Sequence, residues 1–142
     1  MRIADFKLVH RLRVRWAEVD RQGIVFNGHY LTFFDVAVTE YWRTIGVRYP
    51  EDIVANGSDI FAVKAVLEYH APALYDDLLD VCARVSKIGR SSMQFELAIF
   101  RSNERLVSGQ LIYVNADSGT RKSLPVPDFL RLAIGGFEEA EL

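Results

Sequence analysis

The 142-residue chain has the length of one ordinary domain, and because half of its residues are apolar we expect a sizeable core within a single domain, 1–142, rather than a disordered chain. Its 17 basic and 19 acidic residues give a net charge of −2, which gives no reason to expect a nucleic-acid partner. The single cysteine, Cys82, excludes an intrachain disulfide, and the lack of a signal-peptide run or of roughly 18 consecutive apolar residues predicts a cytoplasmic protein without a membrane span.

The first predicted element is a strand near residues 7–16. Apolar side chains and arginines alternate along it with a period of two, which is typical of a strand with one face in solvent. The two sets are His10, Leu12, Val14 and Trp16 on one face, and Arg11, Arg13 and Arg15 on the other.

A helix is predicted next, from about Gly28 to Ile45. Its apolar residues recur at spacings of three and four, and its polar stripe is so narrow that most of the helix should be buried. The apolar set is Leu31, Phe34, Val38, Tyr41 and Ile45, and the stripe is Thr32, Asp35, Thr39 and Arg43. Asn27 is a candidate N-cap and Gly46 a candidate stop.

Four further strands are predicted, over residues 61–70, 79–86, 93–99 and 105–115. Short turns join the last three, at Gly89-Arg90 and Asn103-Glu104, and this favours an antiparallel meander. Pro125-Val126-Pro127 begins a short C-terminal helix or tail. The order β-α-β-β-β-β indicates an α+β fold in which a curved antiparallel sheet wraps around one long helix, with Phe61, Val63, Phe33 and Phe34 in its core.

Chemistry is concentrated in the segment between the first strand and the helix. Asp20 lies just after the strand, Gly23 permits a tight turn, and Ile24-Val25-Phe26 forms an apolar run in a loop. Gly28 stands at the helix start, where backbone N–H groups are free and the helix dipole is positive. A carboxylate, an apolar slot and amide donors are the parts needed to attack a thioester carbonyl.

This segment resembles the 4-hydroxybenzoyl-CoA thioesterase family of the hotdog fold, including its acyl-CoA thioesterase relatives of Tol-Pal type. The shared pattern is Asp-x-x-Gly-[Ile/Val]-Val-[aromatic]-x-x-x-Tyr, met by Asp20, Gly23, Ile24, Val25, Phe26 and Tyr30. Arg13-Val14 in the first strand and Tyr75-Asp76-Asp77 before a later strand also fit. The resemblance extends over nearly the whole chain.

The resemblance implies that Asp20 acts as nucleophile or general base and that an amide near Asn27 polarises the substrate carbonyl. It also implies an active site between two subunits of a homodimer or homotetramer. Two positions depart from the family: Val19 stands where Thr or Cys is common, and Asn27 stands where relatives carry His or Tyr. The nearest histidine here is His29, so a family histidine's role is either moved or lost.

Each candidate residue also has a purely structural interpretation. Asp20 alone would be a turn residue; His29 could contact substrate or only the backbone; Tyr30 is better suited to packing at the site wall than to proton transfer. Glu18 could pair with Asp20 as an acid and base, although a solvated carboxylate at the strand end is favoured. Glu40, on the predicted helix, is a further alternative.

The predicted hairpin at Gly89 carries cations and hydroxyls that could hold the phosphates of CoA, or could simply be an ordinary polar turn. These residues are Lys87, Arg90, Ser91 and Ser92, with Arg84 and Arg101 as weaker candidates. The three histidines, His10, His29 and His70, are far apart in sequence, so no metal site and no cofactor are expected. CoA would be part of the substrate.

These observations predict an enzyme that hydrolyses acyl-CoA to a carboxylic acid and free CoA. The substrate-binding and oxyanion set is Gly23, Val25, Asn27, Gly28, His29 and Tyr30, around the catalytic Asp20. Two alternatives remain open: a hotdog dehydratase or hydratase acting on acyl thioesters, and a non-catalytic acyl-CoA-binding module. The acyl group itself is not specified by the sequence.

Overall fold

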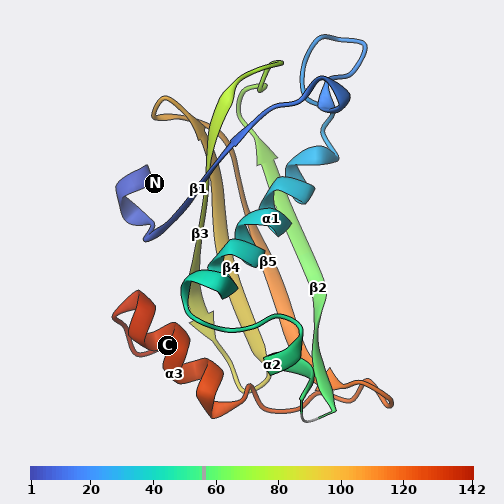
Figure 1. The fold of residues 1–142 in the computed structure, drawn as a ribbon, viewed down its shortest axis with the longest axis vertical. Helices are drawn as coiled ribbons and strands as arrows, with labels where there is room; N and C mark the ends of the chain where they lie inside the picture. The colour runs from blue at the N-terminus through green and yellow to red at the C-terminus, as the bar shows by residue number, and fades with distance from the viewer. Residues whose placement is uncertain (56) are drawn as a thin grey trace.

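One curved sheet of five antiparallel strands organises the computed structural model, which describes residues 1–55 and 57–142 (Figure 1). The strands are β1 (Leu8–Arg13), β2 (Ser58–Tyr69), β3 (Leu78–Ile88), β4 (Ser92–Arg101) and β5 (Glu104–Asp117), in the spatial order β1-β3-β4-β5-β2. The predicted meander of β3, β4 and β5 is confirmed, and its second turn places Ser102 and Asn103 at positive φ. β1 and β2 form the two edges of the sheet.

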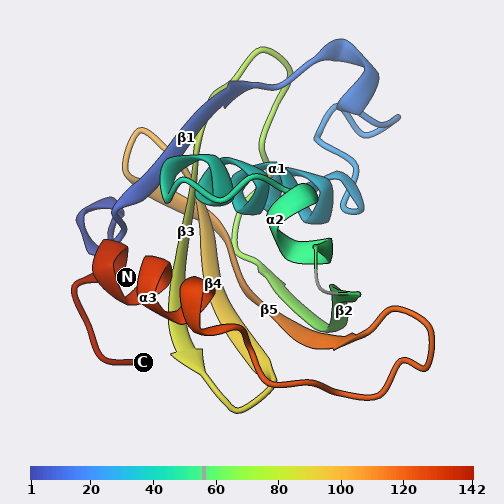
Figure 2. The same ribbon diagram turned by 60° about the horizontal axis from the view of Figure 1, so that its bottom comes forward.

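The long helix α1 (His29–Thr44) crosses one face of the sheet (Figures 1 and 2). Phe34 and Tyr41 are fully buried, whereas Asp35 and Arg43 on the predicted polar stripe are exposed. Gly46, at φ +79°, ends the helical segment as predicted, because a left-handed conformation costs glycine little. The α+β architecture of a curved sheet around one long helix is therefore confirmed.

The C-terminal segment is a true helix, α3 (Asp128–Glu138), where the sequence left a helix or a tail open. It packs beside the C-terminal half of α1, with the rings of Tyr41 and Phe137 5.3 Å apart. The Glu138 carboxylate accepts hydrogen bonds from the Tyr41 hydroxyl at 2.8 Å and from the Val85 N–H at 2.7 Å. This carboxylate therefore joins α3 to both the helix and the sheet.

Three short elements complete the chain: the helix α2 (Glu51–Val54) and 3-10 turns at Ile3–Asp5 and Trp16–Glu18. The prediction that Trp16 continues the first strand's buried face is wrong. β1 ends at Arg13, the chain then turns, and Trp16 is 73% exposed, edge-on to the ring of Tyr75.

The prediction that Val63 belongs to the core is also wrong, and Phe61 is only half-buried. β2 is an edge strand, and a bulge between Ala62 and Lys64 interrupts its register with β5. A bulge shifts the alternation of side chains by one residue. Val63 is consequently 60% exposed, whereas the predicted core residues Phe33 and Phe34 on α1 are buried.

Candidate active site

Asp20 lies in a tight hairpin that follows the 3-10 turn. The hairpin is closed by hydrogen bonds from the Asp20 N–H to the Ile24 oxygen (2.9 Å) and from the Gly23 N–H to the Asp20 oxygen (3.0 Å). Gly23 has φ +81°, which explains the need for glycine there. The Oδ1 atom of Asp20 accepts the N–H of Gln22 at 2.7 Å, so the residue is a turn residue as well as a candidate catalyst.

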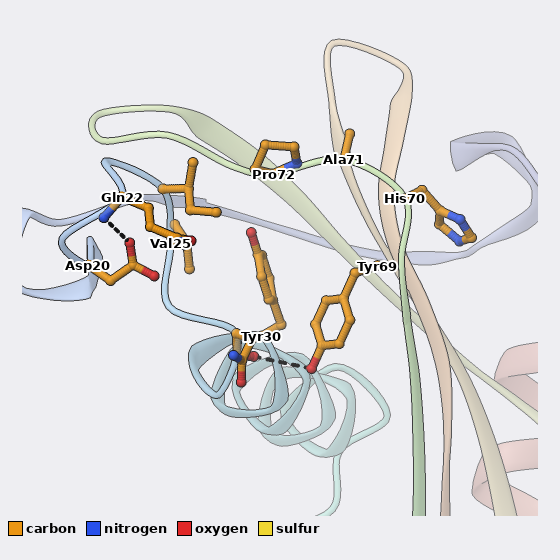
Figure 3. A pocket seen from close by; sticks show the side chains of 10 residues that line it. Asp20, Gln22, Val25, Tyr30, Tyr69, His70, Ala71 and Pro72 are labelled. Atoms are coloured by element: carbon orange, nitrogen blue, oxygen red, sulfur yellow. Dashed lines mark hydrogen bonds between the residues drawn. The ribbon is translucent and has the colours of Figure 1, made fainter.

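A pocket of about 330 Å³ opens beside this hairpin (Figure 3). It brings together four predicted site residues: Asp20, Val25, Asn27 and Tyr30. The remaining wall comes from Gln22, Ile24, Tyr69, His70, Ala71 and Pro72. The end of β2 and the segment after it thus face the loop that carries Asp20.

The residues just before α1 carry the backbone N–H groups predicted as oxyanion donors. The first helical amides, of His29 and Tyr30, are already bonded to the oxygens of Phe26 and Asn27. Within residues 1–55 and 57–142, the N–H groups of Asn27 and Gly28 have no hydrogen-bond acceptor. The prediction of Asn27 as N-cap is wrong, because Gly28 occupies that position. Free amides at a helix N-terminus bind negative charge.

Tyr30 lines the pocket and is 3% exposed. Its hydroxyl accepts the N–H of Ala73 at 3.0 Å, and its ring lies 5.7 Å from that of Tyr69. Burial raises the pKa of Tyr30, and the nearby Asp20 carboxylate acts in the same direction against the Ala73 hydrogen bond. This phenol stays neutral near pH 7, consistent with a residue that packs at the site wall.

The expectation that Glu18 is a solvated carboxylate is wrong, and the alternative of Glu18 paired with Asp20 gains no support. Glu18 is 5% exposed, and its carboxylate accepts the backbone N–H of Arg15 at 2.7 Å and the guanidinium of Arg15 at 2.8 Å. Burial alone would raise the pKa of Glu18, but the hydrogen bonds from Arg15 outweigh it and hold the pKa below its usual range. Glu18 therefore stabilises the 3-10 turn that precedes Asp20.

Replacing Glu18 with glutamine should lower the free energy of unfolding at neutral pH by on the order of 1–3 kcal/mol, because bonds to a charged acceptor are lost. Since the pKa is lowered in the folded state, the stabilisation is present above the ordinary value of 4.5 and disappears as the pH falls through the folded-state pKa. Urea unfolding midpoints at neutral and acid pH measure this. Glu141→Gln, at an exposed position, is the control. An equal difference between the unfolding midpoints of wild type and Glu18→Gln at both pH values would contradict a stabilising role for the ionised Glu18 carboxylate.

The other predicted residues lie around the pocket rather than in it. A Cβ at Gly28 would stand 2.9 Å from the ring of Phe26, so that position favours glycine. His29 is half-buried, with its ring edge-on to Phe26 at 5.6 Å. Glu40 pairs with Arg43 on the surface of α1.

The predicted CoA-binding hairpin lies at the opposite end of the sheet from the pocket (Figure 1). Ser92 is paired with Val114, which is paired with Phe61 near the start of β2, whereas the pocket lies at the end of β2 beside Tyr69. Lys87, Arg90, Ser91 and Ser92 therefore do not meet Asp20 within one chain. Of the weaker candidates, Arg84 pairs with Glu96, and Arg101 pairs with Asp77 and Glu104.

Sequence reasoning missed the part of the pocket formed by residues 69–72. Pro72 marked only the end of a strand, and nothing local connects it with a loop some 50 residues earlier.

Within the described ranges, no group of three or more His, Cys, Asp or Glu side chains is arranged to hold a metal ion. In the same part of the chain, no helix has the length and apolar character needed to cross a membrane.

The sequence of this chain is similar to those of known proteins. The model of the thioesterase superfamily matches residues 22–108. The chain is 29% identical over 123 residues to the acyl-CoA thioesterase YbgC of Haemophilus influenzae, covering 86% of this chain and 90% of that protein. It is 22% identical over 119 residues to a 1,4-dihydroxy-2-naphthoyl-CoA hydrolase of Synechococcus elongatus, with 83% and 88% covered.

Solved structures show the same fold. The PA5185 protein of Pseudomonas aeruginosa superposes with a TM-score of 0.83 at 25% identity, over 96% of this chain and 94% of that one. A thioesterase from Thermus thermophilus, complexed with coenzyme A and Zn, gives a TM-score of 0.82 at 24% identity, over 97% and 98% of the two chains. With its family model matched over more than half of its length, the chain belongs to the thioesterase superfamily.

Proposed function

We propose that this protein hydrolyses acyl-CoA thioesters, with Asp20 as nucleophile or general base. The observation that carries the proposal is a single pocket lined by both Asp20 and Asn27, with the free N–H groups of Asn27 and Gly28 just before α1. Membership of the thioesterase superfamily supports it, as do relatives named acyl-CoA thioesterases. The role of Asp20 is inferred from its position in the pocket.

Two routes fit this arrangement. Asp20 either attacks the thioester carbonyl to give a mixed anhydride that water opens, or it takes a proton from a water molecule that attacks directly. In both, the carbonyl oxygen gains negative charge and the N–H groups of Asn27 and Gly28 stabilise it. One well-placed donor of this kind contributes roughly 3–4 kcal/mol to lowering the barrier. CoA leaves as the thiol, and the acyl group leaves as a carboxylic acid.

Release of free thiol from a panel of acetyl-, hexanoyl-, palmitoyl- and benzoyl-CoA tests the proposal. Thiol release from at least one member at a rate well above the uncatalysed one is the expected result. A change in the enoyl chromophore without thiol release would indicate a dehydratase or hydratase. Binding of every CoA ester without turnover would indicate a binding module.

The separation of the CoA hairpin from Asp20 favours an active site completed by a second copy of the chain. β2 is an edge strand of the sheet, and its side chains Val63, Val66 and Tyr69 are exposed. Two β2 strands paired antiparallel about a two-fold axis would bring the end of one strand, with its pocket, beside the start of the other. The β3–β4 hairpin of the second copy would then approach the first copy's Asp20.

Replacing Val63 with lysine should raise the dissociation constant of this dimer by at least about tenfold, because a charge would be buried at the paired edge. Activity should fall at concentrations where the dimer separates. Analytical ultracentrifugation combined with thiol-release assays measures both. Val9→Lys, on the opposite edge strand where Val9 is 39% exposed, is the matched control. A fully active monomeric wild type would refute the arrangement.

A further inference from the structure

The turn between β3 and β4 is bound to the C-terminal part of the chain by its carbonyl groups. Arg131 of α3 donates from one guanidinium nitrogen to the oxygens of Gly89 and Arg90, the latter at 3.1 Å. The Arg90 oxygen also accepts the N–H of Val126 at 2.8 Å, and the Ser91 oxygen accepts the N–H of Asn115 at 2.8 Å. Three consecutive carbonyl oxygens are thus turned inward and bonded.

The groups that remain on the outside of this turn are donors and cations. In the described part of the chain, the N–H groups of Arg90 and Ser91 have no acceptor, and neither Lys87 nor Arg90 has a carboxylate within 4.0 Å. Lys87 and Arg90 are both exposed. Free N–H groups beside exposed cations suit phosphate oxygens, because both supply hydrogen-bond donors and positive charge.

We infer that Arg131 is a positioning residue for CoA: by bonding the carbonyls of Gly89 and Arg90, it keeps them turned away from the phosphates and makes the turn a phosphate-binding surface. The inference rests on the proposed function, which supplies CoA as the ligand. Unrestrained carbonyl oxygens would repel phosphate, and the guanidinium also neutralises their partial charge. Arginine suits the task because its planar group reaches two oxygens in a fixed geometry, whereas lysine is a flexible point charge.

The framework that holds Arg131 is independent of the ligand. Its neighbours Leu130 and Ile134 are fully buried, so α3 stays packed when the guanidinium is removed. The Val126 and Asn115 bonds also remain, which confines the expected change to the shape and charge of the turn. Arg131→Met should therefore weaken nucleotide binding without unfolding the protein.

Calorimetric titration with CoA itself tests this without any need for turnover. Arg131→Met should raise the Kd for CoA about tenfold, and Arg131→Lys, which retains a positive charge, should raise it several-fold less. In kinetics, KM for an acyl-CoA should rise with kcat nearly unchanged. KM for the same acyl group on N-acetylcysteamine, which has no phosphates, should not change.

Unchanged CoA affinity in both variants would overturn the inference, as would an equal rise in KM for the two thioesters. A wild-type protein that binds CoA but hydrolyses no thioester would instead overturn the proposed function, and the CoA titrations would still decide the role of Arg131. If Arg131→Met does not fold, the Arg131→Lys titration decides the question.

Discussion

Replacing Asp20 with asparagine is expected to reduce kcat for thioester hydrolysis by about 10²- to 10⁴-fold, since the amide can neither accept a proton nor act as a nucleophile. The turn should survive, because the asparagine oxygen can still accept the N–H of Gln22 that Asp20 accepts at 2.7 Å. CoA affinity should also be unchanged. Thiol release under saturating substrate, together with CoA titration, separates the loss of chemistry from a loss of binding.

Asp117→Asn provides the matched control. Asp117 also accepts the N–H two residues ahead, from Gly119 at 2.9 Å, but it lies at the far end of the sheet beside Ser58. The same carboxylate-to-amide change in the same kind of turn should leave kcat within about twofold. Activity of Asp20→Asn close to wild type would show that Asp20 is only a turn residue.

Much of the fold follows from local patterns. The spacing of Phe34, Val38 and Tyr41 predicted α1, and all three are buried. Short turns predicted the β3–β4–β5 meander because such loops can join only neighbouring antiparallel strands. The errors occur where the structure interrupts the alternation of buried and exposed side chains along a strand. The bulge beside Val63 shifts this alternation in the edge strand β2, and the 3-10 turn at Trp16 ends it after β1.

The residues of the candidate site likewise fall into a set that local sequence predicted and a set that it did not. Asp20, Val25, Asn27 and Tyr30 are close in sequence, so one local segment predicted four of the ten residues that line the pocket. Tyr69 and Pro72 join it only through the position of β2 in the sheet, which no local pattern specifies. The burial of Glu18 was also missed, because its hydrogen bonds from Arg15 depend on the 3-10 turn at Trp16–Glu18, and the alternation of side chains in the first strand does not predict that turn.

Alanine at Gly109 is expected to destabilise the protein by about 1–3 kcal/mol or more, because this position is overpacked. A Cβ there would lie 2.2 Å from the backbone oxygen of Val66 on β2 and 2.9 Å from a ring carbon of Phe34 on α1. The backbone oxygen cannot rotate away as a side chain can, so β2 or β5 must shift. Urea unfolding would measure the loss.

Gly136→Ala should have the opposite effect and serves as the control. Gly136 lies within α3, no atom of the described residues stands within 4 Å of a Cβ there, and its φ is not in the left-handed region. Alanine should raise the free energy of unfolding by about 0.5–1 kcal/mol, since it loses less conformational entropy in a helix. Opposite signs for one chemical change would show that the close approach of β2, β5 and α1 at Gly109 requires glycine. A Gly109→Ala variant as stable as wild type would contradict that packing.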